Sequence, residues 1–460
     1  MIVPASIVPY FALERWAPLL LLLLLGGLPL VFDPGPASLY DEVFLLPKTL
    51  WLQLLIAPAA ALMLWVYRRQ LRPFPWMLGM FAAWLMLACL FNEGGWSRNV
   101  TGPLDRNDGL LTHLIYVLVA AAFLAWTRAH PLQALEWTSK MLLMVAGLCA
   151  LVVAAQQFGL LGTLGGERLG GIEAMRGGGT LGHRGYMGGF LALCLPLAFY
   201  RCVRGQRGAA GIAALLTFAL AATWSRGPWL AGAAALLALV LLLPRERRSV
   251  AVWARCTFAA LLGLLLFGLS VLWGPQARSL EGGSLTDSSG RTVLYRTALE
   301  GIAQRPLWGW QSDGVLLAMH ARDPREVVAE IEGRSLPPQA RLRVESDPRS
   351  DSYMARIEGY EKDLVILTTD KVHNEYLDYA VSYGIPAALL FVLLLGAALR
   401  SAVALPAVAA ALVAYAVYLL TWPEVLRFAP LAWALLGLAL PREAWRVKPP
   451  GLQESAGSGT

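Results

Sequence analysis

The chain has 460 residues, of which 57% are hydrophobic and only 15% are charged, and its mean hydropathy is +0.55. A soluble protein of this length cannot bury so much apolar surface in its core, so a bilayer must solvate part of it. The formal net charge of +7 comes without a basic stripe interleaved with aromatic residues, which excludes a typical nucleic-acid-binding protein.

Apolar runs follow one another along most of the chain, and each predicts a helix because lipid offers no other partner for backbone polar groups. The runs are 16–32, 48–67, 76–91, 109–126, 138–158, 185–203, 209–223, 227–243, 253–273, 374–398, 402–421 and 425–440. Several are short for a hydrocarbon core of roughly 30 Å. The expected fold class is an all-α polytopic membrane protein with about 12 transmembrane helices, the first retained as a span.

Positive charge alternates along the connections between these runs and sets the predicted orientation. Arginine and lysine are concentrated in every second connection and at both termini, as at Arg68, Arg69, Arg245 and Arg247. The positive-inside rule therefore predicts that both termini are cytoplasmic. The predicted organisation along the chain is nine spans in 1–273, an outer connection in 274–372, three further spans in 373–447 and a disordered cytoplasmic tail in 448–460.

The connection 274–372 is too long for a passive link and predicts a small helical cap between spans nine and ten. The stretch "TDSSGRTVLYRTALEGIAQRP" combines capping residues, an apolar stripe and a proline stop, which indicates an amphipathic helix. The following charged, proline-bearing stretch "HARDPREVVAEIEGRSLPPQARLRVESDPRSDS" is expected to be mobile.

Several arginines lie on the outer side, where they oppose the orientation signal and need a local reason. They are Arg226 in "ATWSRGPWLAG", Arg176 and Arg184 in "MRGGGTLGHRGYMGG", Arg106 in "PLDRNDGLLTHL", and Arg291. A guanidinium is a permanently charged planar fork that suits phosphate oxygens, so the set predicts a site for an anionic lipid headgroup such as a pyrophosphate. The alternative, a solvated or ion-paired surface arginine, is the interpretation for Arg98, Arg168 and Arg427.

His373 stands at the start of the tenth run, in "TTDKVHNEYLDYAVSYGIP". A neutral imidazole there could accept a hydroxyl proton near neutral pH, and Asp370 or Glu375 could orient it or replace it. The alternative is helix-end capping at the interface. His113 is expected to be structural, and both roles stay open for His183. The five cysteines form no CxxC or Cys/His cluster, so neither a disulfide framework nor a zinc site is predicted, and no metal is expected.

Several of these stretches resemble motifs of the O-antigen ligase and polymerase superfamily. "KVHNEYLDYAVSYGIP" resembles its His-Asn-x-x-Leu…Gly signature, and "WSRGPWLA" its Ser-Arg-Gly span start. "SGRTVLYRTALEGIAQRPLWGWQSDG" is similar to its Gly-Arg element in the large outer loop. "MRGGGTLGHRGYMGGFL" is similar to its Arg…Gly-Thr-x-Gly-Asn stretch, with His183 in place of the usual Asn, and "RNDGLLTHL" to a further element.

The resemblance implies a C-type glycosyltransferase fold in the bacterial inner membrane, with an undecaprenyl-pyrophosphate-linked glycan donor. It implies metal-independent, cofactor-free, inverting transfer at the periplasmic face. By matching motif, His373 would be the catalytic base, and the donor pyrophosphate would be held by Arg226, Arg291, Arg176 and Arg184. Asn374 and Ser225 lie inside the matching motifs and are expected to support the site.

The acceptor stays open at this point: lipid A–core for a ligase, or a second lipid-linked repeat unit for a polymerase. A protein O-oligosaccharyltransferase of the same superfamily is a further alternative. A polysaccharide transporter or flippase belongs to a different class and would need charged residues deep in its spans, whereas here charge gathers at their outer ends. An envelope scaffold would not need outer-face arginines.

Overall fold

The protein is described by a computed structural model that is mostly helical. It describes residues 8–446 except 34–39, 74, 93–94, 104–105, 162–176, 248, 274–290, 313, 333–335, 337–338, 340, 346–351, 359–363 and 369–370. The predicted tail 448–460 therefore lies outside the described residues, as do Arg168, Arg176 and Asp370.

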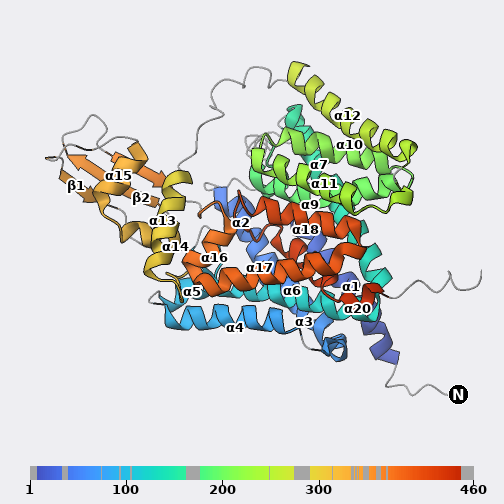
Figure 1. The fold of residues 1–460 in the computed structure, drawn as a ribbon, viewed down its shortest axis with the longest axis horizontal. Coiled ribbons are helices and arrows are strands. Elements are labelled where there is room, and N and C mark those ends of the chain that lie inside the picture. The colour runs from blue at the N-terminus through green and yellow to red at the C-terminus, as the bar shows by residue number, and fades with distance from the viewer. Residues whose placement is uncertain are drawn as a thin grey trace, which may run out of the picture.

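A bundle of helices forms the larger part of the molecule (Figure 1). Before the cap it contains α1 (Val8–Gly27), α2 (Tyr40–Trp51), η1 (Leu52–Ile56), α3 (Ala57–Val66), η2 (Arg68–Leu71), α4 (Trp76–Phe91), α5 (Trp96–Thr101), α6 (Leu110–Ala129), α7 (Pro131–Gln157), η3 (Gly179–Leu181), α9 (Arg184–Val203), α10 (Ala209–Ala222), α11 (Arg226–Leu242), η4 (Arg245–Arg247) and α12 (Val250–Trp273). After the cap it contains α16 (Glu375–Tyr383), α17 (Ile385–Ser401), η5 (Ala402–Ala404), α18 (Pro406–Tyr418), α19 (Ala429–Ala439) and α20 (Arg442–Arg446).

Each predicted apolar run overlaps a helix of this bundle. Six helical segments of the described chain are long and apolar enough to cross a membrane: Val43–Val66, Leu110–Ala129, Pro131–Gln157, Arg184–Val203, Val250–Leu272 and Ile385–Ala404. Shorter apolar helices are α4, α10, α11, α18 and α19. The chain is therefore a helical membrane protein by length and composition, while the number of twelve spans and the C-type glycosyltransferase fold stay predictions.

The bundle interior is apolar and is packed with aromatic and small residues. Trp126, Trp433 and Tyr116 are almost fully buried, and the backbone of Ala120 in α6 leaves no room for a side chain at Gly437 in α19. Such small residues let helices approach closely where lipid provides no hydrophobic drive. All five cysteines are buried and free.

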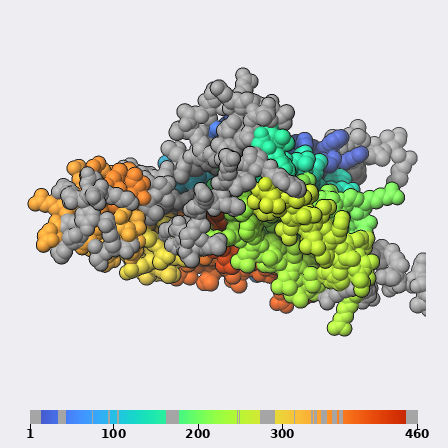
Figure 2. Space-filling model, turned by 90° about the horizontal axis from the view of Figure 1, so that it is seen from above, coloured from blue at the N-terminus to red at the C-terminus, as the bar shows by residue number. Residues whose placement is uncertain are grey.

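The cap stands out from one end of the bundle (Figures 1 and 2). It contains α13 (Arg291–Gln304), α14 (Gly314–His320), α15 (Pro324–Glu332), β1 (Arg341–Val344), β2 (Ser352–Glu358) and β3 (Leu364–Thr368). The strands form an antiparallel sheet of order β1-β2-β3, in which Ala355 of β2 faces Val344 on one side and Val365 on the other. Val293, Leu294 and Ala298 of α13 are buried in the separate core of the cap, which confirms the amphipathic helix.

The expectation of an all-helical cap is wrong, because the cap also holds a three-stranded sheet. In β2, buried Tyr353, Ala355 and Ile357 alternate with the less buried Met354 and Arg356. This alternation buries one face of the strand. The segment is so short that its alternating pattern gives only a weak strand signal within a charged sequence. The charged stretch expected to be mobile also folds in part, into α15 and β1. Arg322 is buried there against two carboxylates, 2.7 Å from Glu300 and 2.9 Å from Glu330.

The run predicted as a tenth span is two helices, α16 and α17, separated at Gly384. Gly384 has φ +86°, and a side chain there would strike the carbonyl of Leu307 in the cap. The Ile385 amide donates a 2.8 Å hydrogen bond to the Pro306 carbonyl. The backbone of the cap at Pro306 and Leu307 therefore contacts the backbone at the break between α16 and α17. Helix α16 lies between the cap and the rest of the bundle.

The start of α1 and the helix α20 both lie at the end of the bundle opposite the cap (Figure 1). This arrangement agrees with the predicted placement of both termini on one side and the cap on the other. Which side is cytoplasmic stays a prediction.

Candidate functional site

Trp422 is the centre around which the predicted site residues gather. It lies in the connection between α18 and α19 and is only 9% exposed. The imidazole of His373 is 5.2 Å from its ring, the imidazole of His183 is 5.0 Å away, and the Arg291 guanidinium carbon is 5.8 Å from the ring centroid. Three connections that are far apart in sequence, all predicted to be outer ones, thus meet at one indole.

The first turns of α9 and α11 press against the same ring. A side chain at Gly185 would come within 2.5 Å of Trp422, and one at Gly227 within 2.9 Å. Only glycine allows this approach at the two positions. Because the first amides of a helix carry partial positive charge, two helix N-termini point their dipoles into the region of Arg291 and His373.

His373 combines a rare backbone conformation with an unpaired ring nitrogen. Its φ is +57°, and Lys371, two residues earlier, has φ +62°. Its Nδ1 atom is buried and has no hydrogen-bond partner among the described residues. Left-handed, non-glycine residues are enriched at functional sites, where surrounding structure holds them in place. Helix capping, the alternative role for His373, is performed by Asn374, whose side chain accepts from the Tyr376 and Leu377 amides of α16.

The charge around the two histidines is strongly positive. Burial, followed by Arg291 and Arg106, lowers the pKa of His373 to about 4. Burial, followed by Arg427, Arg184 and Arg106, lowers the pKa of His183 to about 3. Both imidazoles are therefore neutral at pH 7, and an anion would be attracted to the surrounding guanidinium groups.

Tyr186 lies between two of these arginines. The Arg106 guanidinium donates a 2.9 Å hydrogen bond to the Tyr186 hydroxyl, and Arg427 lies 5.2 Å from the Tyr186 ring centroid. Arg427 also donates to the Leu181 carbonyl at 2.7 Å and is only 5% exposed. The interpretation of Arg427 as a surface residue is therefore wrong: it is buried beneath the glycine-rich turn before α9 and holds a carbonyl of that turn.

The other predicted site residues take different positions. Arg226 and Arg184 are exposed and are the first residues of α11 and α9. Ser225 is the buried N-cap residue of α11, although its side chain makes no capping hydrogen bond. The Glu375 carboxylate is buried, accepts a 2.7 Å hydrogen bond from the Glu424 amide and lies 3.7 Å from the Lys371 ammonium.

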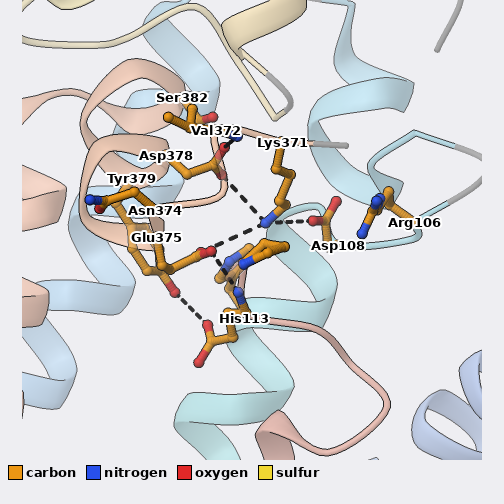
Figure 3. Close-up of polar contacts among 12 residues, drawn as sticks. Arg106, Asp108, His113, Lys371, Val372, Asn374, Glu375, Asp378, Tyr379 and Ser382 are labelled. Carbon is orange, nitrogen blue, oxygen red and sulfur yellow. Dashed lines mark hydrogen bonds and ion pairs between the residues drawn. The ribbon is translucent and has the colours of Figure 1, made fainter. Parts of the chain in front are cut away.

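A buried cluster of ionisable groups lies behind this site (Figure 3). The Lys371 ammonium is 2.7 Å from the Asp108 carboxylate, 3.4 Å from Asp378 and 3.7 Å from Glu375. Burial alone would lower the pKa of Lys371, but Asp108, Asp378 and Glu375 more than offset it and raise the pKa well above its usual value. Lys371 is therefore charged.

The side chains of His113, Glu375 and Glu424 bring possible metal-ligand atoms within 4.8 Å of one another. The Glu424 carboxylate already accepts hydrogen bonds from two tyrosines and a tryptophan, namely Tyr379, Tyr415 and Trp433. His113 Nδ1 lies 3.0 Å from the Gly109 carbonyl. These side chains thus have protein partners that orient them.

Sequence reasoning missed Trp422, Arg427, Lys371 and Asp108. Each lies in or beside a predicted outer connection, as do His183, Arg226, Arg291 and His373. Their proximity to residues already singled out was a signal for two of them. Asp108 follows Arg106 by two residues, and Lys371 precedes His373 by two. The pairing between these segments is visible only after folding.

Residues 211–392 match the family described as O-antigen ligase. The matched range is less than half of the chain. The match supports the resemblance to the O-antigen ligase and polymerase superfamily and, in general terms, O-antigen ligase-type glycan transfer by a membrane enzyme. The comparison with curated proteins gives no match. The matched O-antigen ligase range contains Arg226, Arg291 and His373, whereas Arg106 and Trp422 lie outside it.

Proposed function

We propose that this protein transfers an oligo- or polysaccharide from an undecaprenyl-pyrophosphate donor to a sugar hydroxyl at the periplasmic face of the bacterial inner membrane. The observation that carries the proposal is the convergence of His373, Arg291 and the first turns of α9 and α11 on Trp422, at the end of the bundle that bears the cap. A neutral base and a group of fixed cations are what this transfer needs in one place.

The donor diphosphate binds among the guanidinium groups. Arg291 lies over Trp422, and Arg226 and Arg184 begin the two helices whose N-termini face the site. These groups stabilise the negative charge that develops on the leaving diphosphate, and fixed positive groups need no reorganisation during the reaction. Two or three such forks supply this stabilisation with protein groups alone.

His373 takes the proton of the acceptor hydroxyl. Its Nδ1 is enclosed, so Nε2 is the nitrogen that accepts the proton. The hydroxyl oxygen forms a bond to the anomeric carbon while the bond from that carbon to the diphosphate oxygen breaks. The electron pair of the broken bond leaves with the diphosphate, and attack from the opposite side inverts the anomeric configuration.

Donor binding also makes His373 a better base. Burial, together with Arg291 and Arg106, holds the pKa of His373 at about 4 in the donor-free site. An imidazole with this pKa is only a weak base. A bound diphosphate brings negative charge beside these arginines and raises the pKa toward neutrality. The base is therefore strongest when the donor is in place.

The test is to incubate purified protein with lipid-linked repeat units alone, then with lipid A–core added, and in a third mixture with a serine-containing acceptor peptide. A ladder in the first mixture identifies a polymerase, product only in the second a ligase, and product only in the third a protein O-oligosaccharyltransferase. The His373→Ala variant sets the background. Wild-type protein that stays at this background in all three mixtures contradicts the proposal.

A further inference from the structure

The segment from Lys371 to Asn374 carries His373 into the site in a conformation that its own sequence does not favour. Both Lys371 and His373 have positive φ angles, although neither is a glycine. Such backbone geometry persists only where neighbouring contacts determine it. The contacts that hold this segment therefore decide where the imidazole lies.

Some of these contacts come from the cap and from α16. Val372 is fully buried in the core of the cap, and its amide lies 3.5 Å from a carboxylate oxygen of Asp378. The His373 carbonyl accepts a 3.4 Å hydrogen bond from the Tyr295 hydroxyl of α13. These contacts fix the segment relative to the cap, which bears Arg291.

Lys371 links the same segment to the helix bundle. Its ammonium is 2.7 Å from the carboxylate of Asp108, which lies just before α6 (Figure 3). Asp108 shares its connection with Arg106, which lowers the pKa of His373 and bonds to Tyr186. The side chains of Lys371 and Asp108 are only 5% and 6% exposed, so water screens their attraction weakly.

The pair therefore links the base-bearing segment to the connection that carries Arg106. We infer that Lys371 is a positioning residue for His373, and that its ion pair with Asp108 sets the depth of the imidazole relative to Arg106 and Trp422. The inference rests on the proposed role of His373 as base. Small errors of placement are expensive in this kind of chemistry, since a displacement of about 1 Å can lower the rate roughly 10²-fold.

Asp108→Asn is the sharpest test, because it keeps the shape of the side chain and leaves Lys371 two carboxylates, Glu375 and Asp378. We expect turnover to fall about 10- to 100-fold with KM for the lipid-linked donor within about threefold of wild type. The matched control is Glu345→Gln, which breaks an exposed ion pair with Arg356 in the cap and should leave both parameters unchanged.

A second pair of variants separates charge from packing. Lys371→Met removes the ammonium and should abolish turnover, whereas Lys371→Arg keeps the charge and should restore part of it. Equal turnover in these two variants would overturn the inference, because the charge would then be irrelevant. The Lys371 pair also decides the question should Asp108→Asn fail to fold.

His373→Ala is measured in the same preparation, so that the two proposals fail separately. Wild-type turnover in Asp108→Asn beside an inactive His373→Ala overturns the positioning role and leaves the proposed function standing. Wild-type turnover in His373→Ala overturns the function itself. A loss in Asp108→Asn that follows the folded fraction, or that falls on KM alone, also overturns the inference and leaves Lys371 a structural role.

Discussion

The segment around His183 and the segment around His373 both reach the ring of Trp422, but they hold their imidazoles in different ways. His183 precedes α9, and its Nδ1 accepts a 3.1 Å hydrogen bond from the Gly185 amide, so the ring caps a helix. His373 leaves the capping of α16 to Asn374, and its Nδ1 has no partner in the described part of the chain. The His183 ring thus has a structural partner at Nδ1, whereas the His373 ring has none at Nδ1.

Electrostatics alone would not separate the two residues. Burial and neighbouring arginines lower the pKa of His183 to about 3 and that of His373 to about 4. The difference lies in the backbone, since His373 is left-handed with φ +57° while His183 is extended with φ −146°. A left-handed backbone beside an unpaired ring nitrogen thus distinguishes His373 from His183.

The largest expected effect is that of His373→Ala. We expect glycan transfer to fall roughly 10²–10⁴-fold, the usual contribution of a positioned base, while expression and donor binding survive. Transfer is measured with lipid-linked donor and acceptor, and donor binding by retention of labelled lipid. Wild-type transfer in this variant would remove His373 as the base.

His183→Asn is the matched control, because an asparagine can also cap α9 through its side-chain oxygen. We expect transfer within about threefold of wild type, since this cap is substituted rather than lost. A loss as large as that in His373→Ala would make the two histidines a functional pair and would break the comparison.

The next effect concerns two predicted donor-binding arginines, Arg291 over Trp422 and Arg226 at the start of α11. Arg291→Ala and Arg226→Ala should each weaken donor engagement about 10- to 100-fold, the range expected when a charged hydrogen bond is removed. Lysine at either position should rescue poorly, because the planar fork is lost. KM for the donor reports the effect, and unchanged KM and turnover in both alanine variants would defeat the pyrophosphate assignment.

A smaller effect should appear in the pH dependence. The acid limb of kcat/KM reports the free site, where the pKa of His373 is about 4, and the acid limb of kcat reports the donor complex. Bound diphosphate favours the protonated imidazole, so the kcat limb should lie at higher pH than the kcat/KM limb. The opposite order, measured from about one pH unit below this pKa up to about pH 8, would contradict a diphosphate beside His373.

The smallest expected effect is that of metal removal. The transfer proposed here uses guanidinium groups and helix N-termini for charge stabilisation, so EDTA should leave the initial rate unchanged. The experiment also probes His113, Glu375 and Glu424, which lie close enough to hold a metal ion. A rate that falls with EDTA and returns with one divalent ion would assign a metal to the reaction.

The helical membrane bundle, the amphipathic helix α13 and the resemblance to O-antigen ligases could all be predicted from the sequence. Hydrophobic runs and helix signals are local properties, and His373, Arg226 and Arg291 lie in continuous motifs. The three-stranded sheet of the cap was missed, because short strands in a charged segment carry a weak periodic signal. The break at Gly384 was missed as well, since it depends on the approach of Leu307 from the cap.

Composition thus determined that the chain enters a membrane, and charge alternation predicted that its unusual arginines and His373 fall in outer connections. Tertiary structure alone decided that these connections converge on Trp422, that Arg427 is buried beneath the glycine-rich turn, and that Lys371 pairs with Asp108. The physical reason is that hydrophobicity is summed over neighbouring residues, whereas a contact across 263 positions, as between Lys371 and Asp108, exists only once the helices have packed.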